Sequence, residues 1–272
     1  TVTGAKTDAG TYTATATSSN PNYKFSNPTT RFTINPKEIT VSWSNTPFTY
    51  DGQDHAPVAT LTGTLYSGDA TTINVSGAKK NAGTYTATAT SSNPNYKVST
   101  ATATQSFTIA KREITVSWSN TSPVYNRSNQ HPTATVSSGL VSGDSVTFTY
   151  AGAQKNAGNG YTATATSANS NYVVTNATCS FSIQPKTITV SWSNTTRTYT
   201  GGALKPTAKL SGVISGDNVQ VTVSVGGSTS GKTAVGTYTA VATINNSNYV
   251  LDANTSTVTF TIVAQAPKGK KG

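Results

Sequence analysis

The segment ITVSWSN occurs three times in this chain of 272 residues, beginning at Ile39, Ile114 and Ile188. The copies are therefore 75 and then 74 residues apart, and other short motifs recur between them in the same order. A head-to-tail repeat of this length predicts a tandem array of small domains, each within the size range of an independent fold. Such arrays more often extend and present other domains than perform chemistry.

The repeat length also predicts the domain organisation. The opening TVTGAKTDAGTYTATA matches the middle of later copies, so we expect the first copy to lack its front half and the chain to be a segment of a longer protein. The predicted order is a partial repeat, three full repeats and a basic tail, over residues 1–36, 37–110, 111–185, 186–264 and 265–272. A circularly shifted boundary fits a periodic sequence equally well.

Within one repeat, short alternating segments are separated by turn residues. Ile39, Val41 and Trp43 fall on one side of the first segment, with Thr and Ser on the other, as a strand with one buried face requires. About seven such segments fill a repeat, and residues 93–96 are assigned to a turn. We predict an all-β fold, a tandem array of small Ig-like β-sandwich modules of about 74 residues each with no helices. A β-grasp is the alternative, but it needs a helix that the sequence does not show.

Large aromatic residues recur at the same inward positions of successive repeats and are expected to compensate for a small core. These positions are Trp43, Trp118 and Trp192; Tyr12, Tyr85, Tyr161 and Tyr238; Phe32, Phe107, Phe181 and Phe260.

The connections between repeats are only four residues long, at 35–38, 110–113 and 184–187, and two of them contain Pro. Because Pro fixes its own φ and restricts the residue before it, these connections are unlike flexible Gly- and Ser-rich tethers. We therefore expect a stiff rod, on the order of 120 Å long if each module spans about 30 to 40 Å.

The composition favours an extracellular β-protein. Charged residues make up 10 % of the chain and hydrophobic ones 34 %, and Thr, Ser, Ala, Asn and Gly fill much of the rest. One Cys excludes a disulfide framework within the chain. No apolar run approaches the roughly 20 residues of a membrane span, so the chain is not expected to cross a membrane.

The net charge of +10 is scattered along the chain, with a denser group only at Lys268, Lys270 and Lys271. This distribution favours solvated faces and protection of edge strands over a specific nucleic-acid site. Weak attraction to anionic polymers is the alternative.

No catalytic, cofactor-binding or metal-binding residues are predicted, and no cofactor is expected. His55 and His131 occupy equivalent places where the next copy has Lys205, and a position that accepts Lys is a poor metal ligand. These two are the only histidines, which leaves little material for a catalytic triad or a zinc site.

A recurrent Ser-Gly-Asp turn contains Asp69, Asp144 and Asp217. Calcium needs six or more oxygens, usually from clustered carboxylates, and each repeat supplies one Asp here. We therefore interpret these residues as turn formers whose side chains bond nearby backbone.

Cys179 shares strand parity with Phe181 and Ile183, which favours a buried small hydrophobe over a reactive thiol. The outward Thr row at residues 84–90 is interpreted as ordinary β-propensity, with glycan contact, sugar attachment or ice binding as alternatives.

The ordered motifs ITVSWSN, FTYDG, SGD, GAKKNAGTYTATAT, NPNYK and FTI resemble the MBG-type and YDG-type repeats of large bacterial surface proteins and adhesins. The resemblance covers nearly the whole chain and implies an extracellular, Ig-like or similar all-β stalk module. It carries over no catalytic residues. Residues 125–127 and 199–201 depart from the Tyr-Asp-Gly of residues 50–52, which argues against a shared ligand at this turn.

The leading hypothesis is a non-enzymatic extracellular stalk of a bacterial surface adhesin or fibre that presents another domain. The first alternative is a module that itself binds glycan or cell-wall polymer, with a host or cell-surface glycan or protein as partner. The second is decoration of a phage or other extracellular particle, and an accessory region of a secreted glycosidase is a third. Strand addition between like chains at the half repeat is a further partner hypothesis.

Overall fold

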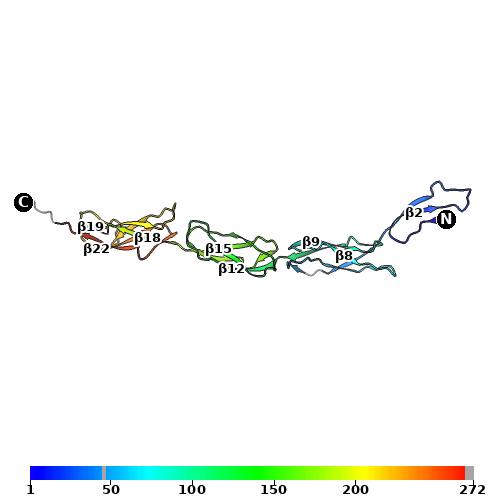
Figure 1. The fold of residues 1–272 in the computed structure, drawn as a ribbon, viewed down its shortest axis with the longest axis horizontal. Helices are drawn as coiled ribbons and strands as arrows, with labels where there is room; N and C mark the ends of the chain where they lie inside the picture. Colours follow the sequence, from blue (N-terminus) through cyan, green and yellow to red (C-terminus); the bar gives the residue numbers. More distant parts are fainter. Residues whose placement is uncertain (45–46, 267–272) are drawn as a thin grey trace, which may run out of the picture. The chain divides into compact units, whose positions relative to one another are not determined.

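The computed structural model describes residues 1–44 and 47–266, and every regular element among them is a strand (Figure 1). This confirms the predicted all-β tandem array. In this part of the chain no helix is long and apolar enough to cross a membrane. Asn45 of the first ITVSWSN copy and most of the predicted basic tail, including Lys268, Lys270 and Lys271, lie outside the described residues.

The chain divides into two compact units, and the division falls inside the middle repeat. The first unit consists of Thr1–Ile114, Gly139–Val146 and Asn169–Val173. The second unit consists of Thr115–Ser138, Thr147–Ala168 and the described chain from Val174 onward. Each unit thus contains one complete junction between two full repeats.

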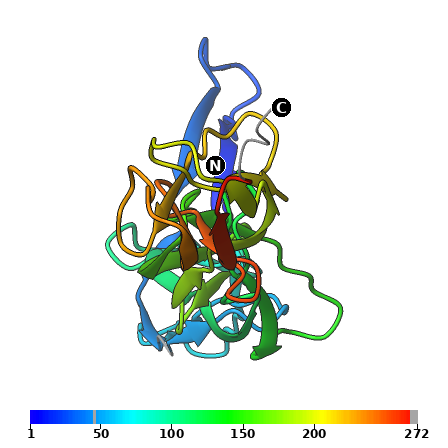
Figure 2. The ribbon, with the colours of Figure 1, turned by 90° about the vertical axis from the view of Figure 1, so that its left-hand side faces the viewer.

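Residues 1–36, in the first unit, form a single sheet (blue in Figure 1 and Figure 2). Its strands are β1 (Val2–Thr3), β2 (Gly10–Ala16) and β3 (Thr29–Ile34). They lie in the order β1-β2-β3, and both pairs are antiparallel.

The first full repeat has seven strand regions, because β4 and β5 are one strand interrupted at Thr40. Its strands are β4 (Lys37–Ile39), β5 (Val41–Ser44), β6 (Phe48–Thr49), β7 (Val58–Leu61), β8 (Ile73–Ser76), β9 (Gly83–Ser91), β10 (Tyr96–Val98) and β11 (Thr104–Ala110). One sheet has the order β6-β11-β9-β8, and the pairs β10-β4 and β5-β7 form the other side. A buried cluster joins the two sides, with Ile39 and Val41 from one and Ala89 from the other.

The third repeat, in the second unit, has the same elements with an uninterrupted first strand. Its strands are β18 (Lys186–Ser193), β19 (Thr196–Thr198), β20 (Thr207–Ser211), β21 (Val221–Val225), β22 (Gly236–Ile244), β23 (Tyr249–Leu251) and β24 (Thr257–Val263). They form a three-stranded sheet, β20-β18-β23, and a four-stranded sheet, β19-β24-β22-β21. Phe260 and Ile262 are at the centre of its core, at 0 % and 1 % exposure.

The middle repeat contributes to both units. Its strands are β12 (Arg112–Ser119), β13 (Thr133–Ser138), β14 (Phe148–Ala151), β15 (Gly158–Ser167), β16 (Tyr172–Val174) and β17 (Thr178–Ile183). The start of β12 lies beside β16 in the first unit, and its remainder pairs with β13 in the second. The strands β14, β15 and β17 form an antiparallel sheet in the second unit.

In the first and third repeats, each sheet has one edge strand that pairs in parallel with its neighbour. In the first repeat β10 pairs with β4 and β6 with β11, and in the third repeat β23 pairs with β18 and β19 with β24. Tyr96 therefore begins a strand and is 3 % exposed, which corrects its assignment to a turn. A three-residue edge strand is too short to show alternation, and its partner β4 lies about 60 residues earlier in the chain.

The recurrent Trp residues face inward but are only half-buried. The indole nitrogen of Trp43 donates to the carbonyl of Thr102 at 2.8 Å, and Trp192 makes the equivalent bond to Thr255. At the end of the motif, Asn120 and Asn194 have φ of 55° and 57°. Asn tolerates this left-handed conformation better than most residues, which explains why it ends the ITVSWSN motif.

Candidate functional site

The Asp of each Ser-Gly-Asp turn contacts a tyrosine far away in sequence. The turn itself forms as predicted, since the Asp144 amide donates to the carbonyl of Val141 at 3.0 Å. Its carboxylate, however, accepts a hydrogen bond from the Tyr172 hydroxyl at 2.6 Å, and Asp217 accepts one from Tyr249 at the same distance. The prediction that these side chains bond nearby backbone is therefore wrong, because the strand-borne tyrosines provide better-placed donors.

A second tyrosine, from the preceding repeat, reaches the same carboxylate. In the first junction, between the first and middle full repeats, Tyr50 donates to the same Oδ2 atom of Asp144 at 2.8 Å. The rings of Tyr50 and Tyr172 meet edge to face, with centroids 5.4 Å apart. The tyrosines are 3 % and 2 % exposed. We call this three-residue arrangement the tyrosine clamp.

The clamp is electrostatically consistent, with neutral tyrosines donating to an ionised carboxylate. The hydrogen bonds from Tyr172 and Tyr50 lower the pKa of Asp144. Burial, together with the bond to Asp144, raises the pKa of Tyr172 to about 12. The pKa of Tyr50 is also raised, mainly by its hydrogen bond to Asp144. The Tyr172 hydroxyl oxygen in addition accepts a hydrogen bond from the amide of Val141 at 3.1 Å, so the hydroxyl acts both as donor and as acceptor.

The second junction, between the middle and third repeats, has an equivalent clamp in the second unit. Tyr125 and Tyr249 both donate to Oδ2 of Asp217, at 2.9 and 2.6 Å. Their rings again meet edge to face, with centroids 5.5 Å apart. The Ile214 amide donates to the Tyr249 hydroxyl at 3.1 Å, as Val141 does in the first junction.

An arginine is added to the second junction. Arg127 takes the position of Gly52 in the Tyr-Asp-Gly turn and keeps a left-handed φ of 71°. Its Nε lies 3.2 Å from Oδ1 of Asp217, and its Nη1 donates to the carbonyl of Ser215 at 2.5 Å. Gly216 has a φ of 89°, which favours Gly, and a β-carbon there would also require the guanidinium to shift. Arg127 is one further cause of the lowered pKa of Asp217, after the hydrogen bonds from Tyr249 and Tyr125.

A bridging asparagine forms the second contact of each junction. In the first junction, Asn171 accepts the Ala82 amide at 2.8 Å and donates to the Asn81 side chain at 3.1 Å. Its backbone carbonyl accepts the Arg112 amide at 2.8 Å. Asn171 is 8 % exposed, so its polar atoms lie away from bulk water and depend on these partners.

The same asparagine position bridges the other contacts between repeats. Asn248 accepts the Ala157 amide at 2.7 Å and donates to Asn156 at 3.3 Å in the second junction. Asn95 accepts the Ala9 amide at 2.7 Å, which joins the half repeat to the first full repeat.

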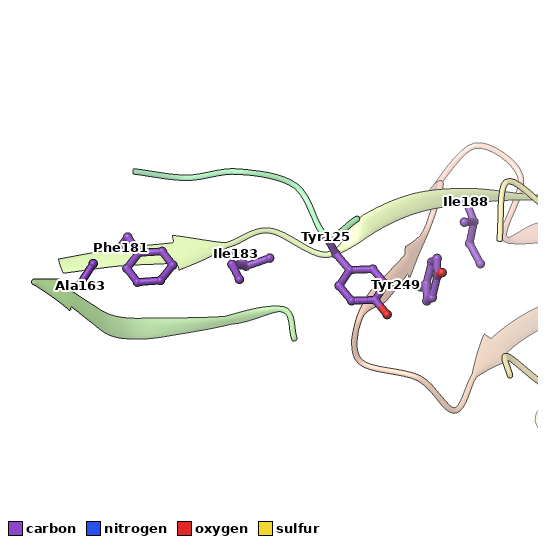
Figure 3. Packing of buried hydrophobic residues seen from close by; sticks show 6 residues of the cluster. All are labelled: Tyr125, Ala163, Phe181, Ile183, Ile188 and Tyr249. Carbon is purple, nitrogen blue, oxygen red and sulfur yellow. The ribbon is translucent and has the colours of Figure 1, made fainter. Parts of the chain in front are cut away.

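Short connections and a continuous core complete the second junction. Only Gln184 and Pro185 separate β17 from β18. A single buried cluster contains Ile183 from the middle repeat, Ile188 from the third, and the clamp residues Tyr125 and Tyr249. Figure 3 shows the two tyrosine rings adjacent to each other between Ile183 and Ile188. Apolar packing and hydrogen bonds therefore act on the same contact.

His55 and His131 each pack against an aromatic residue of their own repeat. His55 stacks on Phe48 with centroids 4.7 Å apart and lies 2.8 Å from an Asp51 carboxylate oxygen. His131 stacks on Tyr150 at 4.1 Å. Lys205 at the equivalent place donates to the carbonyl of Thr229 at 3.1 Å. Within residues 1–44 and 47–266 no three His, Cys, Asp or Glu side chains are grouped so as to hold a metal ion.

Cys179 is half-buried, not fully buried as expected, and its thiol lies 3.3 Å from the carbonyl of Ser180. It pairs with Ala163 across β15 and β17. Thr84, Thr86 and Thr90 of the outward row are exposed, as the strand alternation predicts, whereas Thr88 of the same row is half-buried.

Sequence reasoning missed the clamp tyrosines and the bridging asparagines as functional residues. Their recurrence was visible, since a Tyr opens each turn at 50, 125 and 199, and an Asn-Tyr pair follows each long strand. Both lie in turn motifs, and no local pattern in the sequence indicates which distant residue they contact.

No curated protein sequence matches the chain at a significant level. The model of the MBG domain family, by contrast, matches residues 39–113, 114–187 and 188–266. Each match begins at the first residue of an ITVSWSN segment, and together they cover well over half of the 272 residues. The chain therefore belongs to the MBG domain family, a repeat domain of surface proteins, and contains three of its domains in tandem.

Proposed function

We propose that the chain is a stiff, non-enzymatic spacer, the stalk of a bacterial surface adhesin or fibre, which holds another domain away from the cell. Its location is extracellular, on the cell surface or secreted. The proposal rests on the family and above all on one observation: in both junctions between full repeats, a half-buried carboxylate accepts hydrogen bonds from tyrosines of both repeats.

This observation favours stiffness for a physical reason. A carboxylate that accepts two tyrosine hydroxyls holds both repeats at one distance, and the bridging asparagine holds them at a second point. Two separated attachment points resist bending better than one, and connections such as Gln184–Pro185 leave little slack.

Solution scattering tests the proposal. The wild-type chain is expected to give a maximum dimension on the order of 120 Å and a curve fitted by one extended conformation. A variant with about ten Gly and Ser residues inserted after Lys111 is the matched control, and its curve should require an ensemble of bent conformations. A wild-type curve that already requires such an ensemble would refute the stalk proposal.

The glycan-binding alternative differs in its expected result. A spacer shows no saturable binding on an array of host and cell-wall glycans, whereas a binding module shows saturable binding to at least one. The Asp144→Ala variant, which alters a junction and no exposed Tyr or Lys side chain, separates binding from stiffness.

A further inference from the structure

The long strand of the middle repeat carries an extra residue. In the first and third repeats a single threonine, Thr84 or Thr237, lies between the Gly and the Tyr of this strand and has a partner in the last strand. In the middle repeat Asn159 and Gly160 take its place. The register of β15 against β17 shifts at this point, so that these two residues face only Ser182. Two residues opposite one form a β-bulge, which lies outside the regular ladder.

The bulge contains the one Asn-Gly dipeptide among the 272 residues. Asn159 and Gly160 are both exposed. Gly160 has a φ of 74°, and a β-carbon placed on it would meet none of the described atoms within 4 Å. Because Gly has no side chain and the space beside it is open, the backbone nitrogen of Gly160 is accessible to the carboxamide carbon of Asn159.

The Asn159 carboxamide also differs from others in the second unit. Asn248 accepts the Ala157 amide at 2.7 Å, and Asn176 both accepts from the Val116 amide at 2.9 Å and donates to its carbonyl at 2.7 Å. Within residues 1–44 and 47–266, no hydrogen bond to the Asn159 carboxamide is found. Its carbon can therefore rotate toward the Gly160 nitrogen without breaking a contact.

We propose that Asn159–Gly160 is a site of spontaneous covalent modification, at which the chain converts its own asparagine to aspartate and isoaspartate. The Gly160 backbone nitrogen loses its proton to water and forms a bond to Cγ of Asn159. The bond between Cγ and the carboxamide nitrogen breaks, and this nitrogen takes up a proton and leaves as ammonia. Both reacting groups belong to one chain, so the attack needs no second molecule.

Water completes the reaction by opening the five-membered succinimide ring. Attack of water on Cγ breaks the new bond to Gly160 and gives aspartate. Attack on the main-chain carbonyl carbon of residue 159 breaks the original peptide bond and gives isoaspartate, in which the main chain runs through the side chain. Neither route changes an oxidation state, and both add one negative charge to the bulge.

The bulge lies next to the asparagine bridge of the second junction. The Tyr161 hydroxyl donates to the carbonyl of Asn156 at 3.1 Å and so closes a short loop that contains Asn159. Inside the same loop is Ala157, whose amide Asn248 accepts. Isoaspartate lengthens the main chain of this closed loop by one methylene group, so we expect it to weaken the bond between Ala157 and Asn248. This inference does not depend on the stalk role.

Peptide mapping of the full chain by mass spectrometry tests the site. The chain is incubated at neutral and at mildly alkaline pH, and the Asn, Asp and isoaspartyl forms of each peptide are separated. Products at Asn159 should accumulate about tenfold faster, or more, than at Asn81 and Asn156, which precede Ala, and tenfold corresponds to about 1.4 kcal/mol in activation free energy. The rate should rise with pH, because the attacking nitrogen must lose a proton.

The matched control is Asn159→Gln, which keeps a carboxamide but would have to form a six-membered ring. Products at this position should then fall to the level seen at Asn81 and Asn156. A synthetic peptide of residues 155–163 separates the local sequence from the fold. A folded chain that stays unmodified at Asn159 while the peptide reacts would show that the bulge protects the site and would overturn the proposal. Reaction at Asn156 as fast as at Asn159 would overturn it too.

Hydrogen exchange at the Ala157 amide measures the consequence for the bridge. Exchange should be faster in the isoaspartate fraction than in the fresh chain. Asn159→Asp carries the added charge without the added methylene group and should exchange at close to the wild-type rate. Equal exchange in the isoaspartate fraction and the fresh chain would refute the expected effect on the bridge.

Discussion

The two junctions between full repeats share one clamp but differ in what surrounds it. In the first, Asp144 accepts two tyrosine hydroxyls, and no ion pair to it is found among the described residues. In the second, Asp217 accepts two tyrosine hydroxyls and also pairs with Arg127. The tyrosines and the carboxylate are therefore the common requirement, and the arginine is an addition.

Typical interaction free energies indicate whether the tyrosine hydrogen bonds or the ion pair stabilise a junction more. A hydrogen bond to a charged group contributes about 1.5–3 kcal/mol, and the clamp tyrosines are 2–4 % exposed. An exposed ion pair contributes about 0–1 kcal/mol, and the Arg127 side chain is 42 % exposed. A left-handed φ costs a non-glycine residue about 1–2 kcal/mol, which offsets the ion pair. The difference between the junctions should thus appear in salt and pH dependence more than in stability.

The largest expected effect comes from removing the carboxylate. Asp144→Ala and Asp217→Ala each leave two buried tyrosine hydroxyls without their acceptor, at a cost of about 1–3 kcal/mol per hydroxyl. Hydrogen exchange at the amides of Val141 and Ile214, which bond the clamp tyrosines, measures the loss in each junction. Asp69→Ala is the control, because among the described residues only the Tyr96 hydroxyl donates to the Asp69 carboxylate. About half the effect is expected there, read at the Tyr66 amide, which donates to Tyr96. Equal effects at all three sites would contradict the clamp.

A smaller effect is expected at the bridging asparagines, and it should differ between the junctions. Asn171→Ala removes a buried side chain and leaves the part-buried Ala82 amide without its acceptor, which should cost about 1–3 kcal/mol. Asn248 is half-buried, so water can replace part of its bonding, and Asn248→Ala should cost less. Exchange rates of the Ala82 and Ala157 amides report the two costs. A larger loss at Asn248 would show that burial does not set the strength of the bridge.

Arg127→Gly should change stability little and salt dependence clearly. The variant loses an exposed ion pair, but Gly adopts the left-handed φ at lower cost than Arg. The free energy of unfolding should therefore change by no more than about 0.5–1 kcal/mol. In the wild type, exchange at Ile214 should become faster between low salt and 1 M NaCl, because salt screens the ion pair. In the variant this dependence should weaken to that of the first junction, since Lys155 still acts on Asp217 as Lys80 acts on Asp144. A salt response in the variant as large as in the wild type would show that Arg127 is not its main source.

The smallest effect is a shift in acid sensitivity. The folded-state pKa values of Asp144 and Asp217 are both lowered, so their stabilisation is present above the ordinary Asp pKa and is lost as pH falls through the folded value. Arg127→Gly removes one cause of lowering at Asp217 and should raise the pH at which the second junction loosens. Carboxyl chemical shifts followed by NMR titration measure both midpoints, and Asp144 in the same sample is the internal control.

The strands could be predicted because their signals are local. The alternation of Ile39, Val41 and Trp43 indicates a buried face without reference to any other segment. The short strands β6 and β10 were missed because two or three residues show no period. The Trp residues were placed on the correct side, but their partial burial depends on how far the facing sheet extends over them.

The candidate site was much less predictable. Each Ser-Gly-Asp turn, each Tyr at positions 50 and 125, and each Asn-Tyr pair was visible as a recurring motif. Their mutual contact was not, since Tyr50 and Asp144 are 94 residues apart and Ala82 and Asn171 are 89 apart. The change from Gly52 to Arg127 looked like a loss of a motif, whereas in the structure Arg127 gains an acidic partner in the next repeat.

The repeat, the all-β class and the inward face of each long strand follow from the amino-acid sequence alone, because a period of two and a period of 74 or 75 residues both recur along the chain. The role of the turn Asp as an acceptor for two tyrosines, and that of Asn171 as a bridge, follow only from the packing of the folded chain. Those roles arise where the end of one repeat meets the start of the next, and a hydrogen bond across that surface depends on the positions of both partners in space.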